Sequence, residues 1–180
     1  AELEGVEFDL RKELPFATWF DLDPVWNGFR VSFNVSYIDS EVTLLGAGET
    51  AEDVPLTGDR RISPLFSNTR PMTGQSDWLA NALLTYEDPN LGILATLAYN
   101  YTGERIVLVG ERSAPDIIEE DRHRVDLLFR YSFGLWDQDL EVEAKVANLL
   151  DEEVELTQGG QPYERWDPGI TYGVTLKARF

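Results

Sequence analysis

The sequence predicts an all-β fold from three observations: side chains alternate with a period of two, the alternating segments are long, and aromatic residues stand near their ends. The last twelve residues show the alternation most clearly, because apolar side chains occupy every even position from Ile170 to Phe180. The odd positions from Gly169 to Arg179 are small, polar or charged. A period of two is typical of a strand with one apolar and one polar face.

Seven segments alternate in this way, and we expect each of them to be a strand. They span about residues 3–12, 28–42, 76–87, 91–104, 121–133, 138–149 and 169–180. Twelve residues of strand reach about 40 Å, whereas strands in soluble proteins usually have about five or six residues. Strands of this length, tilted by about 40°, can cross a hydrocarbon layer. The pattern therefore predicts a transmembrane antiparallel β-barrel.

The aromatic residues support the same interpretation. Trp78 and Tyr86 bracket the aliphatic part of the third segment, and Phe29 and Tyr37 bracket that of the second. Amphipathic rings at strand ends are typical of the two interfacial girdles of a membrane barrel. The alternative is a β-sandwich core, in which aromatic residues would more often fall in the middle of strands.

The connections between the segments alternate in length. Tight turns are expected at residues 88–90 and 134–137. Three connections are long, and they span about residues 43–75, 105–120 and 150–168. Long loops on one side and tight turns on the other are the arrangement of outer-membrane barrels. The connection over residues 13–27 falls on the short side, and Pro15 and Pro24 predict a folded turn there.

The composition excludes several functions. A net charge of −18 would repel a nucleic acid, so none is expected as a partner. The absence of cysteine excludes disulfides and thiolate metal sites, and the only histidine, His123, cannot form a His-rich centre. His123 is expected on the apolar face of its strand, which leaves no usable Ser-His-Asp arrangement. We therefore expect no cofactor and no enzymatic activity.

Charged side chains offer two further hypotheses. The acidic clusters Glu119–Asp121 and Asp151–Glu153 could bind a hard cation through oxygen ligands, although solvated loop charge is the favoured interpretation. Basic residues share the polar faces of the fifth and seventh segments, and they are Arg122, Arg124, Arg130, Lys177 and Arg179. Ion pairs with carboxylates of neighbouring strands are the favoured role for them. The alternative is a lining that grips an anionic solute.

A series of short motifs also occurs along nearly the whole chain. It comprises Arg70-Pro71-Met72-Thr73-Gly74-Gln75-Ser76, Asn81-Ala82-Leu83-Leu84-Thr85-Tyr86-Glu87, Tyr99-Asn100-Tyr101-Thr102-Gly103-Glu104-Arg105-Ile106, Val109-Gly110, Pro115-Asp116-Ile117-Ile118-Glu119, Asn148-Leu149-Leu150-Asp151, Asp167-Pro168-Gly169 and the terminal Phe180. In order and spacing, the series resembles the C-terminal part of the barrel of TonB-dependent outer-membrane receptors. It is similar to the branch of that family that is common in Bacteroidota.

The resemblance implies the C-terminal part of a 22-stranded barrel that encloses an N-terminal plug. Residues 1–180 would supply about the last seven strands of this one barrel domain. Seven strands cannot close on themselves, and an unpaired edge in lipid would be costly. We therefore expect the earlier strands, the plug and the TonB-binding segment outside this chain, in the same protein or in another chain.

The resemblance also implies a function and a location. The protein would bind a small molecule, glycan or peptide outside the cell and import it into the periplasm of a bacterium, with energy transmitted through TonB. Its other partners would be outer-membrane lipid and the barrel-assembly machinery. Two alternatives stay open: a passive porin-type barrel, and a structural barrel subunit of an envelope complex.

Two sets of residues are candidates for sites in this scheme. The family's closing strand carries the signal that the barrel-assembly machinery reads, and the matching residues are Gly173, Leu176, Ala178 and Phe180. Candidate ligand contacts in the long connections are Arg60, Arg61, Glu111 and Arg112.

Overall fold

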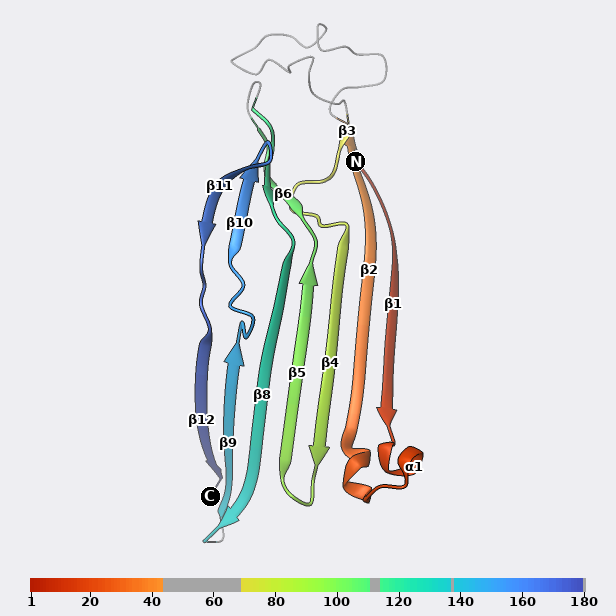
Figure 1. Cartoon of the computed structure of the whole chain (residues 1–180), viewed down its shortest axis with the longest axis vertical. Coiled ribbons are helices and arrows are strands. Elements are labelled where there is room, and N and C mark those ends of the chain that lie inside the picture. Colours follow the sequence, from red (N-terminus) through yellow and green to blue (C-terminus); the bar gives the residue numbers. More distant parts are fainter. Residues whose placement is uncertain (44–68, 111–113, 137, 180) are drawn as a thin grey trace, which may run out of the picture.

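The computed structural model describes residues 1–43, 69–110, 114–136 and 138–179, and most of them lie in antiparallel strands. Seven long strands form the main sheet in this order: β1 (Glu2–Leu14), β2 (Phe29–Thr43), β4 (Trp78–Asp88), β5 (Ile93–Thr102), β8 (Arg122–Leu135), β9 (Gln138–Ala147) and β12 (Thr171–Arg179). Each pairs with the next along the sheet (Figure 1), and the short strand β3 (Thr69–Arg70) pairs with the end of β2. The all-β, antiparallel part of the prediction is confirmed.

The predicted strand bounds agree with the observed ones to within two residues at every strand end. This agreement follows from the alternation itself. A slip of one residue would exchange the two faces of a strand, so the pattern constrains the register strongly.

The two ends of the main sheet differ in their connections. Figure 1 shows tight turns at the lower end, which we call the short-turn end, and longer segments at the upper, long-connection end. In the turn between β4 and β5, the Asp88 carboxylate accepts hydrogen bonds from the amides of Asn90 and Leu91, at 2.9 and 3.2 Å. Gly92 follows with a φ of +68°, and a Cβ there would lie 2.0 Å from the Ser132 carbonyl oxygen. Only glycine fits this position.

The connection between β1 and β2 is folded, as the two prolines predicted. It contains the helix α1 (Phe16–Phe20) and the 3-10 helix η1 (Pro24–Gly28), and we call residues 15–28 the foot. The foot lies at the short-turn end beside the base of β1 (Figure 1). Neither helix in the described part of the chain has the length and apolar character of a membrane span.

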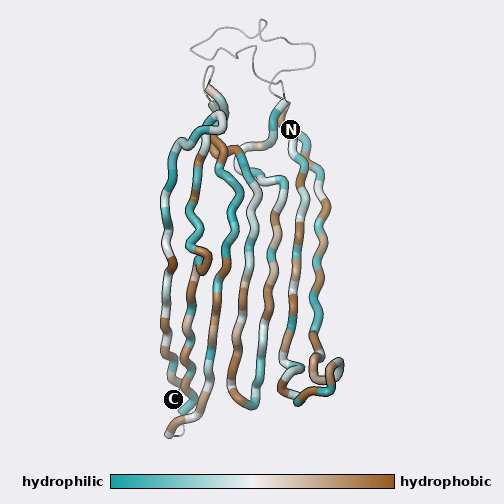
Figure 2. Tube along the Cα trace, in the orientation of Figure 1, coloured by the Kyte–Doolittle hydropathy of each residue, from teal (hydrophilic) through white to brown (hydrophobic). Residues whose placement is uncertain are grey.

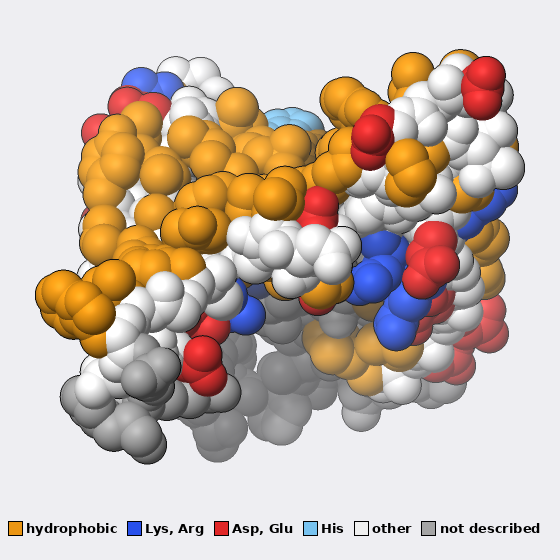
Figure 3. Space-filling model, turned by 90° about the horizontal axis from the view of Figure 1, so that it is seen from below, with side chains coloured by type: hydrophobic (Ala, Val, Ile, Leu, Met, Phe, Trp, Pro, Cys, Tyr) orange, Lys and Arg blue, Asp and Glu red, His pale blue; other side chains and the backbone are white. Residues whose placement is uncertain are grey.

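The strand register gathers the apolar side chains on one face of the main sheet. Residues directly opposite each other in an antiparallel pair share a face. One such row contains Val31, Leu84, Leu97, Leu127, Val146 and Tyr172. Brown and teal therefore alternate along the strands in Figure 2. In Figure 3, an orange band follows one side of the curved sheet, and red and blue side chains appear in its hollow.

A second, smaller sheet stands at the long-connection end. Its strand order is β11 (Gln161–Trp166), β10 (Val154–Gln158), β7 (Ile117–Glu119) and β6 (Arg105–Leu108). The segments 105–120 and 150–168 were expected to be long connections, and the expectation is wrong for these four strands. Their alternation is short, and it is visible only at Val154 and Leu156 against Glu155 and Thr157.

Burial differs sharply between the two sheets. Among the described residues, the buried apolar side chains are Ala17 in the foot and Ile106, Ile117, Val154 and Leu156 in the small sheet. On the apolar face of the main sheet, by contrast, Val6 is 74 % exposed and Val174 is 78 % exposed. An uncovered apolar face of this extent indicates contact with another apolar medium or partner.

The main sheet is open at both edges. β1 pairs only with β2 and β12 only with β9 among the described strands, and the two edge strands do not meet. This agrees with the expectation that seven strands cannot close. Each edge presents backbone N–H and C=O groups that can pair with a further strand.

Candidate functional site

The polar face of the main sheet carries a four-residue ion cluster near the short-turn end. Arg130 on β8 lies 2.9 Å from Glu143 and 3.5 Å from Glu141, both on β9. Lys177 on β12 reaches the same two carboxylates, at 2.8 Å from Glu141 and 3.8 Å from Glu143. The two cations are thus matched by two carboxylates across three strands.

This matching bears on the two roles predicted for the basic residues. A lining that grips an anionic solute needs a surplus of positive charge, and this cluster has none. Arg124 is paired as well, because its Nε lies 2.8 Å from Asp126. Arg122 stands opposite Thr102 at the long-connection end. Of Arg179 only the backbone is described, so the geometry favours ion pairing at Arg124, Arg130 and Lys177.

The ion cluster should contribute modestly to stability, because its members remain partly exposed. In a double-mutant cycle with Arg130→Gln and Glu143→Gln, we expect a coupling energy on the order of 1 kcal/mol or less, but above zero. Denaturant unfolding in lipid vesicles measures it. Arg130→Gln combined with Glu7→Gln on the distant β1 is the control, and these two effects should add. A coupling of zero would contradict the structural role and favour the anion-binding alternative.

Asn148 organises the place where β9 ends. It is buried and has a left-handed φ of +58°. Its Nδ2 donates to the carbonyls of Glu152 and Gly169, both at 3.2 Å, and its Oδ1 accepts from the Glu152 amide at 3.1 Å. Its own amide donates to the Asp126 carboxylate at 3.0 Å. One side chain therefore ties the segment after β9 to the segment before β12.

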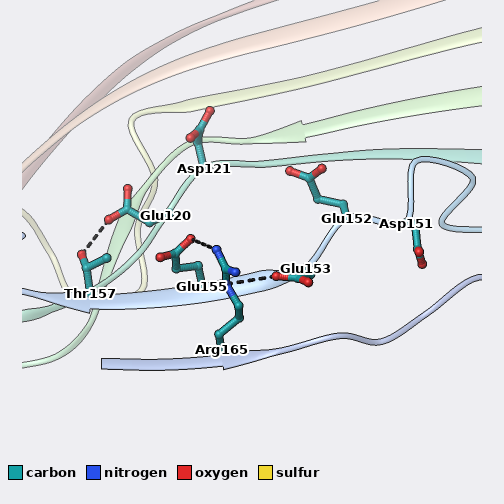
Figure 4. A pocket seen from close by; sticks show the side chains of 8 residues that line it. All are labelled: Glu120, Asp121, Asp151, Glu152, Glu153, Glu155, Thr157 and Arg165. Carbon is teal, nitrogen blue, oxygen red and sulfur yellow. Dashed lines mark hydrogen bonds and ion pairs between the residues drawn. The ribbon is translucent and has the colours of Figure 1, made fainter. Parts of the chain in front are cut away.

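The structure brings the two acidic clusters of the sequence analysis together. All their residues except Glu119 lie on a cavity of about 570 Å³ at the long-connection end (Figure 4), lined by Glu120, Asp121, Asp151, Glu152, Glu153, Glu155, Thr157 and Arg165. Six carboxylates and one guanidinium make this acidic pocket strongly negative. It will repel anions and attract cationic groups.

Several of the carboxylates in the acidic pocket already have partners. Arg165 contacts Glu153 at 3.0 Å and Glu155 at 3.1 Å, and Thr157 donates to Glu120 at 2.6 Å. The hydrogen bond with Glu155 and the charge of Glu153 raise the pKa of Arg165. Within the described residues, no three His, Cys, Asp or Glu side chains converge as metal ligands. Three of the six carboxylates, Glu120, Glu153 and Glu155, are thus engaged within the protein.

Two other polar contacts lie near the long-connection end. In the small sheet, Arg105 donates to Glu119 through Nε at 3.2 Å and Nη2 at 2.8 Å, which joins β6 to β7. On the apolar face, His123 Nδ1 is hydrogen-bonded to the Tyr99 hydroxyl at 2.8 Å, and its Nε2 lies 3.6 Å from Asp121. The imidazole therefore has a phenol and a carboxylate beside it, in the place on the apolar face that the alternation predicted.

Only some of the candidate site residues lie in the described part of the chain. On β12, Leu176 and Ala178 lie on the apolar face, opposite Val142 and Leu140, whereas Gly173 lies on the polar face opposite Lys145. The fourth residue of the predicted assembly signal, Phe180, lies outside the described residues. So do the four candidate ligand contacts, Arg60, Arg61, Glu111 and Arg112.

Sequence reasoning missed the role of Asn148, although its tetrapeptide Asn148-Leu149-Leu150-Asp151 was noticed for its resemblance. Its two bonds with Glu152 are local, but the bonds with Gly169 and Asp126 join segments more than twenty residues apart, and no local pattern predicts those. In comparisons with known proteins, no family model, no curated protein and no solved structure matches the chain.

Proposed function

We propose that this chain forms part of a transmembrane β-barrel in a bacterial outer membrane. The observation that carries the proposal is the uncovered apolar face of the main sheet, which runs across all seven long strands. Within the described part of the chain only the foot packs on this face, at Phe29, and large side chains such as Val6, Leu97 and Val174 remain exposed. Lipid can cover such a face, because its fluid acyl chains need no complementary shape.

Strand length and aromatic placement support the same proposal. The seven strands have 9 to 15 residues, and about 9–11 residues of tilted strand cross a bilayer. Tyr37 packs on Trp78 at the long-connection end, with ring centroids 4.8 Å apart, and Phe29 packs on Tyr86 at the short-turn end, also at 4.8 Å. Trp78 and Tyr86 are eight residues apart on β4, a rise of about 26 Å. At a strand tilt of about 40° this corresponds to about 20 Å along the membrane normal, which approaches the ~25 Å apolar band of outer-membrane barrels.

Within this class, we propose a TonB-dependent receptor that imports a nutrient. The motif series supports this assignment, and the open edges of β1 and β12 are consistent with a larger barrel completed by other strands. The small sheet and the acidic pocket would then face the outside of the cell, and the foot would face the periplasm. The plug and the TonB-binding segment would lie outside this chain, and Arg60, Arg61, Glu111 and Arg112 stay the candidate ligand contacts within it.

Transport by an energised receptor can be separated from passive diffusion by experiment. The intact polypeptide that contains this chain should be isolated from the outer-membrane fraction of its source cell and reconstituted into vesicles of phosphatidylethanolamine and phosphatidylglycerol. A plugged receptor should give no swelling of the vesicles in an isotonic solution of arabinose. Deletion of the segment that precedes the barrel should then produce swelling, because it removes the plug.

The outcomes exclude different parts of the proposal. Swelling with the intact polypeptide would indicate a porin and contradict the receptor. Recovery of the polypeptide in the aqueous fraction, without detergent, would contradict the membrane location itself. A matched preparation of empty vesicles controls for leakage.

A further inference from the structure

The foot carries an aromatic cluster that continues the apolar face of the main sheet. Phe16 contacts Trp19, Phe20 and Phe29, with ring centroids 5.7, 6.2 and 5.5 Å apart. Trp26 stacks on Phe29 at 6.1 Å. Phe29 belongs to the apolar face, where it stands opposite Tyr86. The foot therefore folds toward this face, and it contains brown segments at the lower right of Figure 2.

The cluster is not closed over by the protein. Trp19 is 48 % exposed, Phe20 is 65 % exposed and Trp26 is 46 % exposed. These rings extend beyond the last paired residues of β1 and β2, Leu14 and Phe29. Joining two strands does not require exposed aromatic side chains, so the three exposed rings suggest contact with an apolar medium.

A lysine side chain lies beside the aromatic cluster of the foot. Lys12 stands on the apolar face of β1, because it lies directly opposite Val31. Its ammonium group lies 5.4 Å from the centroid of the Trp19 ring, within the range of a cation–π contact. A lysine on a lipid-facing surface extends its charged end toward the phosphates, and tryptophan prefers the same depth.

The backbone of the foot is also suited to a poorly hydrated place. The Ala17 amide donates to the Asn27 side chain at 3.0 Å, and the Val25 amide donates to Asp23 at 3.0 Å. Further amides donate to backbone carbonyls, Trp19 to Pro15 and Leu22 to Ala17, both at 3.0 Å. Polar groups that are already bonded lose less when water is removed.

We propose that the foot is an interfacial anchor: it inserts Trp19, Phe20 and Trp26 into the headgroup region of the membrane leaflet at the short-turn end, with Lys12 at the level of the lipid phosphates. This inference rests on the proposed membrane location. The occupant is a phospholipid leaflet because the cluster is continuous with the proposed lipid-facing surface and has a cation beside the Trp19 ring, at the same level. The anchor fixes the depth of β1 and β2.

Spin-label depth measurements test the anchor. The chain contains no cysteine, so Phe20→Cys can be labelled with a nitroxide, with Val174→Cys and Asn90→Cys as references in separate samples. The probe is the labelled polypeptide in vesicles of phosphatidylethanolamine and phosphatidylglycerol, and the readout is collision with oxygen against a nickel complex. We expect the Phe20 label about 5–10 Å into the headgroup and acyl boundary. Val174 should be deeper, and Asn90, on the neighbouring turn, should be in water.

Three results would overturn the anchor, and they differ from one another. If the Phe20 label is as accessible to the nickel complex as Asn90 while Val174 is deep, the membrane location holds but the foot lies in water. If the Phe20 label is accessible to neither reagent, protein covers the foot. If Val174 is also in water, the proposed function fails together with the anchor.

Discussion

Replacing Val174 by arginine should prevent most of the chain from assembling in the membrane. Val174 lies in the middle of β12 on the apolar face, opposite Ala144, and 78 % of it is exposed. In the proposed barrel this surface meets hydrocarbon, where an arginine costs about 2–4 kcal/mol at mid-bilayer. Such a loss is a large fraction of the stability of most domains. The folded fraction can be measured by its faster migration in gels when the sample is not boiled.

Thr175→Arg is the matched control for this substitution. Thr175 is the next residue on the same strand, but it faces the polar side opposite Glu143. Because carboxylates of the ion cluster lie beside it, a new arginine there should cost less than about 1 kcal/mol. Equal damage from both substitutions would show that the two faces of β12 have been assigned wrongly. An improved yield of soluble protein from Val174→Arg would show that the apolar face meets water.

Asn148→Ala should strongly destabilise the place where β9 ends. It removes three hydrogen bonds of a buried side chain and leaves the carbonyls of Glu152 and Gly169 without this donor. It also places alanine at a φ of +58°, which is unfavourable for a residue with a Cβ. We expect a loss of about 2–4 kcal/mol in the free energy of unfolding. Denaturant unfolding in vesicles measures the loss.

Asn148→Gly separates the two causes of that loss. Glycine adopts the left-handed conformation freely, so this variant should recover about 1 kcal/mol relative to alanine and still lack the hydrogen bonds. Hydrogen exchange of the Glu152 amide should be accelerated in both variants, because its acceptor is gone. Wild-type exchange at this amide in either variant would contradict the role given to Asn148.

The main sheet could be predicted from the sequence because its strands repeat one simple pattern over many residues. Each long strand presents an apolar face along its whole length. This produces an alternation of apolar and polar residues that can be recognised in the strand's own sequence, whichever strands pair with it. The turn at Asp88 and the folded connection between β1 and β2 could be predicted for a similar reason, since turn residues act locally. Whether the sheet belongs to a closed barrel stays a prediction.

The small sheet and the hydrogen bonds of Asn148 could not be predicted in the same way. The strands of the small sheet have three to six residues, too few for alternation to stand out among charged neighbours. The acidic pocket unites Glu120 and Asp121 with residues about thirty positions later, through the pairing of β7 with β10. This proximity depends on the pairing of distant strands, so it could not be predicted from the two acidic clusters in the sequence.

The contrast in burial between the two sheets has a consequence for how the sequence can change. In the small sheet, Val154 and Leu156 fit against fixed neighbours, so both the size and the shape of a replacement will matter. On the apolar face of the main sheet, the proposed neighbours are fluid acyl chains, which can adapt to side chains of different shape. At such positions only the hydrophobicity of the side chain would be selected. Aliphatic residues could therefore replace one another there, while the residues of the polar face and of the turns would change less.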